Sequence, residues 1–210
     1  MREVRKRQST LLFQDEAGVR EDGPIGTTWG ERGATPALRV TGGHRRTHAI
    51  WAISPRGRLR FRGYSGKLNA QGFIEFLRAL SHDLRKKIDV AVDRNPPHTA
   101  AAVARFVAAQ NGRIRLHVLP RHAPDPNADE HVWTYLKGMF RRDPLDQDED
   151  LERVVKLSMN KIQRNWKLVR SFFVHPEVEY IRKALRWGGH PNRIHPSNAT
   201  VSIGRLFFGF

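Results

Sequence analysis

The chain has 210 residues, 39% of them hydrophobic, which is enough for one domain with a core and an extension. Its 37 Lys and Arg against 21 Asp and Glu give a formal net charge of +16, which favours a polyanionic partner, above all nucleic acid. The absence of cysteine excludes disulfides, thiol catalysis and thiolate zinc sites. No apolar run is long enough to span a bilayer and no signal peptide is evident, so we expect a cytoplasmic protein with no membrane partner.

The first half of the chain has the pattern of short strands. Residues 9–15, STLLFQD, predict a buried strand that ends on acids. The stretch RLRFR at 58–62 alternates, which indicates a strand with one basic face; its arginines fit a solvated face or phosphate contacts. Between them we expect a Gly- and Pro-rich loop or hairpin at 22–36, then strands at 37–40 and 47–53 around a Gly42-Gly43 turn.

The second half alternates helices with strands. Asn69 is placed to cap a helix that carries Phe73, Phe76, Leu77 and Leu80 at helical spacing. The elements expected after it are a strand at 87–93, a helix at 99–110, a strand at 113–119, a helix from 129, a long helix at about 151–173 and a short helix at 177–187. This order predicts an α/β fold with a mixed sheet and helices on both faces.

Three acids stand at element ends: Asp15 and Asp93 end predicted strands, and Glu130 begins a predicted helix. In a mixed sheet the strands that end at Asp15 and Asp93 can be neighbours, which would bring these carboxylates to one edge. Carboxylates that meet there repel one another unless cations lie between them, and hard oxygen ligands suit Mg²⁺ or Mn²⁺. Taken singly, each acid is better explained as a turn or helix-cap residue than as a catalytic one.

The contexts of these acids resemble those of a known family. FQDEAG at 13–18, followed by TWG at 28–30, is similar to the first-acid block of the DDE transposases of the insertion-sequence 630 and Tc/mariner superfamily. VDRNPPH at 92–98 resembles the second block. LPRHAPDPNADEHVWTYLK at 119–137 resembles the third and most specific block, and the 37 positions between Asp93 and Glu130 fall in the range of this superfamily.

The resemblance implies a ribonuclease-H-like five-stranded mixed sheet over residues 1–145, a C-terminal helical extension at 146–187 and an irregular tail at 188–210. It implies that Asp15, Asp93 and Glu130 bind two Mg²⁺ or Mn²⁺ ions and catalyse DNA cleavage and strand transfer in cut-and-paste transposition. Glu16 alternates to the other face of the strand, and Asp129 points about 100° away on the helix, so neither is preferred. The expected partners are transposon-end and target DNA, with a homodimer assembled on DNA at the nucleoid of a prokaryotic cell.

The sequence departs from the family in its third block, where Ala128 replaces the usual Pro and His122 the usual aromatic residue, and at Arg94 beside the second acid. The first strand begins almost at once, so we expect no N-terminal helix-turn-helix region, as in a split transposase, a fragment or a decayed copy. The alternatives are therefore an inactive basic DNA-binding remnant or another ribonuclease-H-like nuclease.

Two further features have open interpretations. His98 follows Asp93 by five positions, and either orients substrate or water at the site or serves as a helix-cap or surface residue. The tryptophans at 29, 51, 133 and 166 are placed on apolar stripes and are predicted to pack in the core or against helices rather than stack on bases.

Overall fold

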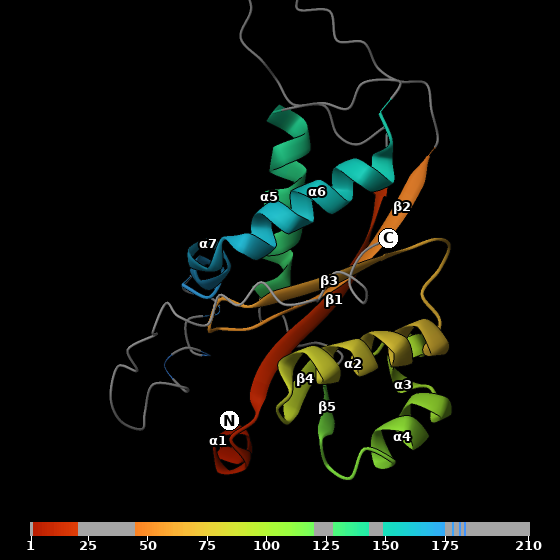
Figure 1. The fold of residues 1–210 in the computed structure, drawn as a ribbon, viewed down its shortest axis with the longest axis vertical. Helices are drawn as coiled ribbons and strands as arrows, with labels where there is room; N and C mark the ends of the chain where they lie inside the picture. The colour runs from red at the N-terminus through yellow and green to blue at the C-terminus, as the bar shows by residue number, and fades with distance from the viewer. Residues whose placement is uncertain are drawn as a thin grey trace, which may run out of the picture.

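The structure is a computed structural model, and it describes residues 2–20, 45–119, 128–142 and 149–174 together with 178, 181 and 183. Its elements form a sheet with helices on both sides (Figure 1). The strands are β1 (Thr10–Arg20), β2 (Arg46–Ile53), β3 (Leu59–Tyr64), β4 (Ile88–Val92) and β5 (Ile114–Val118). The helices are α1 (Arg2–Arg7), α2 (Ala70–Leu84), α3 (Pro96–Thr99), α4 (Ala101–Ala108), α5 (Ala128–Arg142), α6 (Leu151–Arg164) and α7 (Trp166–Ser171).

The five strands form one sheet in the order β3-β2-β1-β4-β5. β1 pairs antiparallel with β2 and parallel with β4, and β4 pairs parallel with β5. The parallel pairs are those whose strands are separated by helices, as a right-handed crossover requires. The predicted mixed sheet, with the first and fourth strands as neighbours, is confirmed.

Alternation along β1 divides the core into two layers. Leu11 and Phe13 face the same cluster as Val132 of α5, Val155 of α6 and Val169 of α7. Leu12, which lies between them, faces the cluster formed by α2 and α4. Successive side chains of a strand point to opposite faces, so an apolar run such as LLF has both faces covered. Figure 1 shows α5, α6 and α7 on one side of the sheet and α2, α3 and α4 on the other.

Helix α2 forms where the sequence predicts it. The Asn69 side chain accepts a hydrogen bond from the backbone N–H of Gly72, which satisfies one of the unpaired donors of the first turn. Phe73, Phe76 and Leu80 are fully buried on the sheet-facing stripe. The helix ends at Arg85, whose φ of 49° is left-handed.

Three boundaries differ from the prediction. β1 continues to Arg20, so Asp15 lies in the middle of the strand rather than at its end, because pairing with β2 extends well past the apolar run. The Pro96-Pro97 pair begins α3 instead of only breaking the chain, since proline fits the first helical positions. The long helix at 151–173 is two helices, because Asn165 leaves helical geometry and its side chain caps Leu168 N–H of α7.

Several predictions fall on residues outside the described ranges. These are the loop at 22–36, the strand at 37–40, the Gly42-Gly43 turn, most of the helix at 177–187 and the tail at 188–210. Among the described helices, none has the length and apolar character needed to cross a membrane.

Candidate active site at the centre of the sheet

Asp15 and Asp93 come from the two central strands. Asp15 stands on β1 opposite Trp51 of β2, on the face that α5 covers. Asp93 directly follows β4, whose parallel pairing aligns Phe13 with Ala91. Continuing that register by two residues brings Asp15 and Asp93 side by side on the same face. The prediction that the neighbouring strands bring these two acids together therefore agrees with the register.

The charges on neighbouring acids act directly on Asp15. Burial raises the pKa of Asp15 to about 7. The backbone N–H of Glu16, which donates a 2.8 Å hydrogen bond to Oδ1, works against that rise. The carboxylates of Glu16, Asp93 and Glu130 add to it by electrostatic repulsion. Asp93 and Glu130 are therefore near enough to Asp15 for their charges to act on it.

Glu130 lies in the first turn of α5, directly beside Asp129. The Glu130 side chain is exposed, whereas Asp129 is completely buried. Adjacent helical positions point about 100° apart, which accounts for this difference. Only the outward one can meet a substrate, and that is the acid whose charge reaches Asp15.

His98 lies between the carboxylates of Asp93 and Glu16. It is 3% exposed, so it is not a surface residue; it packs its ring 4.5 Å from that of Phe73, centroid to centroid. Its Nδ1 donates a 2.6 Å hydrogen bond to Oδ1 of Asp93, and its Nε2 lies 3.3 Å from Oε2 of Glu16 at an angle unsuited to a hydrogen bond. Burial works to lower the pKa of His98, but these two carboxylates outweigh it and raise that pKa to about 9.

Asp93 is held in its charged form by the same contacts. Burial alone would raise the pKa of Asp93. The hydrogen bonds from His98 and from the backbone N–H of Asn95, together with the His98 charge, lower it instead. The surroundings therefore lower the pKa of Asp93 and raise the pKa of Asp15. Opposite pKa shifts are typical of acids with different tasks in one site.

Glu16 is a site residue that the sequence did not identify. It accepts hydrogen bonds from Asn95 Nδ2 at 3.0 Å and from Gln14 Nε2 at 2.9 Å, and it lies beside His98. Glu16 does point to the opposite face from Asp15, as the alternation predicts. It nevertheless reaches the site, because His98 bridges from Glu16 to Asp93 across the end of β4. The sequence signal for this contact was the segment VDRNPPH at 92–98, which places Asn95 and His98 close to Asp93.

The stability of the metal-free protein is expected to depend on His98 between pH 6.5 and 9. A histidine whose pKa is raised from 6.5 to about 9 on folding stabilises the fold fully below pH 6.5, and this contribution is lost as the pH rises through 9. The loss amounts to about 3 kcal/mol at most. Urea unfolding at a series of pH values, with chelator, should show this decline in the wild type and a flatter profile in His98→Gln. Equal slopes in both proteins would contradict the assignment.

The donor set suits a hard divalent cation. Carboxylate oxygens are the ligands that Mg²⁺ and Mn²⁺ prefer, and a cation beside Asp15 would favour its charged form against the burial, and the smaller repulsion, that raise its pKa. Asp93, whose side chain is 46% exposed, and Glu130 are open to solvent. Within the described ranges, no three His, Asp or Glu side chains are gathered tightly enough to coordinate an ion as they stand. The site thus has the donors, and ligation requires side-chain movement.

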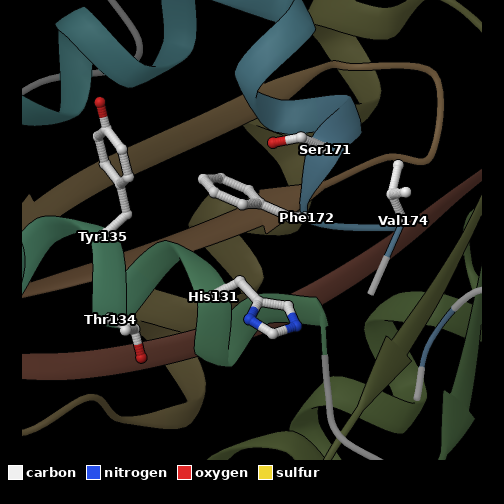
Figure 2. A pocket seen from close by; sticks show the side chains of 6 residues that line it. All are labelled: His131, Thr134, Tyr135, Ser171, Phe172 and Val174. Atoms are coloured by element: carbon white, nitrogen blue, oxygen red, sulfur yellow. The ribbon is translucent and has the colours of Figure 1, made fainter. Parts of the chain in front are cut away.

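A surface hollow of about 340 Å³ lies between α5 and the end of α7 (Figure 2). The Phe172 ring lies near both His131 and Tyr135, with centroid distances of 6.5 and 6.1 Å. The full lining is His131, Thr134, Tyr135, Ser171, Phe172 and Val174. This hollow connects the acid-bearing end of α5 to α7.

A mixed five-stranded sheet in this order, with helices on both faces, defines the ribonuclease-H-like fold. Solved structures of this fold match the chain. A Mos1 transposase paired-end complex with left transposon end matches at a TM-score of 0.60 and 17% identity, covering 88% of this chain and 57% of that one. The Mos1 mariner paired end complex with Mn matches at 0.61 and 18%, covering 84% and 54%.

The sequence also matches a family. The family described as DDE superfamily endonuclease matches residues 10–152, which contain all three acids and the whole sheet. The chain belongs to this family. It spans little more than half the length of the Mos1 transposase chains that it resembles. Among curated proteins, none matches the sequence significantly.

Proposed function

We propose that this chain is the catalytic core of a cut-and-paste transposase, which cleaves DNA at the ends of a mobile element and joins the freed ends to target DNA. Asp15, Asp93 and Glu130 are its catalytic, metal-binding residues. The observation that carries this proposal is the parallel register of β1 and β4, which aligns Asp15 with Asp93 in the middle of a ribonuclease-H-like sheet; the effect of the Glu130 charge on Asp15 supports it. The family match and the fold support it.

Two Mg²⁺ or Mn²⁺ ions, when bound, would activate an attacking oxygen and stabilise the leaving oxygen at a phosphodiester. The three acids differ in ionisation and exposure before a metal ion binds. Asp93 is already ionised through His98, and Asp15 gives up its proton readily once a cation offsets the repulsion. Glu130 is exposed at the start of a helix, so its side chain can reorient to complete the ligand set.

His98, Asn95 and Glu16 act as positioning residues. His98 holds Oδ1 of Asp93, and Asn95 holds Glu16 from the same loop. Because Glu16 belongs to β1, where Gln14 also donates to it, the Asn95 hydrogen bond ties the loop after β4 to β1. This fixes the direction in which Asp93 presents its free oxygen, as outer-shell partners do at metal sites.

The proposed partners are element-end DNA and target DNA. A net charge of +16 provides the attraction to a polyanion. Two ends must be cut and joined together, so we propose a homodimer on DNA, in the cytoplasm at the nucleoid of a prokaryote. Residues 1–145 would form the catalytic core and residues 146–187 a helical extension.

The experiment that tests this function uses the full chain with plasmid DNA that carries the terminal sequences flanking its own gene. With Mg²⁺ or Mn²⁺ we expect strand breaks at those ends and, on longer incubation, products joined to a second plasmid. Chelator should abolish both. Cleavage of an RNA–DNA hybrid or a four-way junction in place of these ends would contradict transposition, and the absence of any metal-dependent breakage would identify an inactive remnant.

A further inference from the structure

The corner between the β2–β3 turn and α7 has an unusual composition. It contains Arg56, Arg58, Trp166, Lys167 and Arg170, which we call the turn–α7 patch. Trp166 is 45% exposed, so the prediction that it packs in the core is wrong. Asn165 ends α6 and turns the chain, which takes Trp166 off the apolar stripe of the predicted long helix.

Gly57 holds the two halves of the patch together. It has a φ of 85°, and a Cβ built on it would lie 2.5 Å from the backbone oxygen of Trp166 and 2.9 Å from Cγ of Arg170. Only glycine allows this approach. The turn therefore packs directly on α7, and Arg56 and Arg58, which flank Gly57 and are exposed, stand beside the cations of α7.

The arginines of the 56–62 stretch are not equivalent. On β3, Arg60 pairs with Asp83, and Arg62 pairs with Glu75 at 3.1 Å. Arg56 and Arg58, in the turn, form no ion pair with any described carboxylate, and the same holds for Lys167 and Arg170 of α7. Four cations are thus gathered on one corner without neutralisation by the described part of the chain. Such a cluster is repulsive unless an anion binds to it.

The Trp166 ring contacts two of these four cations. The Arg170 guanidinium carbon lies 5.4 Å from the ring centroid and Lys167 Nζ lies 5.9 Å from it. Cation–π contacts of this kind hold both cations near the ring face without cancelling their charge. The side chains are therefore partly ordered before an anion arrives, which lowers the entropy cost of binding.

The patch is continuous with the acid site. α7 runs from Trp166 to Ser171, and the next residue, Phe172, contacts His131, which directly follows Glu130 (Figure 2). A nucleic-acid strand cleaved at the three acids would extend beyond them in both directions. A basic patch at the start of the helix whose end packs on α5 is therefore suited to contact such an extension.

We propose that the turn–α7 patch binds the sugar–phosphate backbone of the duplex DNA that is cleaved at Asp15, Asp93 and Glu130. This rests on the proposed function, because DNA is the substrate there. The chemistry is that of phosphate positioning: the patch has Lys and Arg side chains without carboxylate partners beside an aromatic ring, and it contains no acidic side chain to accept from a base. Binding here would therefore be independent of base sequence.

The test compares two double variants with the same loss of charge. Arg56→Gln with Arg58→Gln removes two patch cations, and the matched control, Arg60→Gln with Arg62→Gln, removes two paired ones from the same stretch. Affinity for duplex DNA is measured by fluorescence anisotropy with chelator at several salt concentrations. We expect the patch variant to bind more weakly and to reduce the slope of log Kd against log salt by about two, or about one per lost phosphate contact. The control should change little.

A second pair, Lys167→Gln with Arg170→Gln, should reproduce the loss, and melting curves check that each variant is folded. Equal affinity losses in the patch and control variants would overturn the proposal, because only bulk charge would then matter. So would a loss in Trp166→Ala that is greater for single-stranded than for duplex DNA, since this would indicate base stacking. If the wild type itself fails to bind DNA, the proposed function fails; if it binds and the patch variants bind equally well, only the patch proposal fails.

Discussion

Replacing Glu130 by alanine is expected to reduce metal-dependent DNA cleavage by about a thousandfold or more and to leave the fold intact. The residue is exposed in the first turn of α5, so its removal takes away no packing. It would, however, remove one of three carboxylates that hold the ions, and loss of one member of a catalytic set typically costs orders of magnitude in rate. The measurement is the single-turnover rate of nicking an end-containing plasmid with Mn²⁺.

Glu152→Ala is the matched control for this variant. Glu152 is also an acid in the first turn of a helix, α6, so its removal changes the net charge and the helix-end electrostatics in the same way. Its cleavage rate should stay within a factor of about two of the wild type, the range expected of a surface change. A Glu130→Ala protein that cuts at the wild-type rate, or a Glu152→Ala protein that is equally impaired, would remove Glu130 from the site.

Asp15→Asn is expected to make the metal-free protein more stable and the metal-loaded protein inactive. A carboxyl whose pKa rises from 3.8 to about 7 on folding destabilises the fold as the pH rises from about 4 to 7, and the full cost is present above pH 7. Asparagine has no charge to bury, so at pH 8 the variant should exceed the wild type by about 2–4 kcal/mol. Below pH 4 the two should be alike.

The same experiment with Mn²⁺ separates a metal ligand from a buried acid. Mn²⁺ should raise the melting temperature of the wild type, more at pH 8 than at pH 5.5, and should have little effect on Asp15→Asn. Asp89→Asn is the control, because Asp89 is fully buried but is paired with His117 at 2.7 Å and Arg7 at 3.5 Å. It should be destabilised at pH 8 and should keep the Mn²⁺ response. Destabilisation of the metal-free protein by Asp15→Asn at pH 8 would refute this account of the site.

Elements whose identity depends on local pattern were predicted well from the sequence. The β-branched run before Asp93 became β4, and Asn69 caps α2, because strand alternation and side-chain capping are encoded within a few residues. The neighbouring placement of Asp15 and Asp93 followed from topology rules that apply to any mixed sheet.

What the sequence missed depended on contacts between distant segments. Glu16 has the alternation of a residue facing away from the acids, yet Asn95, 79 positions later, binds it. Trp166 lies on an uninterrupted apolar stripe, but a single capping side chain at Asn165 ends the helix and exposes it. Arg58 and Arg60 look alike in RLRFR, and only the fold shows that Asp83 neutralises one of them. Such differences are set by tertiary partners, which periodicity does not report.

The most direct measurement of the central claim is a calorimetric titration of the folded, DNA-free chain with Mn²⁺ at pH 6.5, where Asp15, with a pKa of about 7, still holds most of its proton. The same titration is made on the triple variant Asp15→Asn, Asp93→Asn and Glu130→Gln, which keeps the side-chain volumes. If the three acids form a metal centre, the wild type binds Mn²⁺ and releases protons from Asp15, and the triple variant shows neither the binding heat nor the proton release. Identical titrations of the two proteins would show that these carboxylates do not bind the metal.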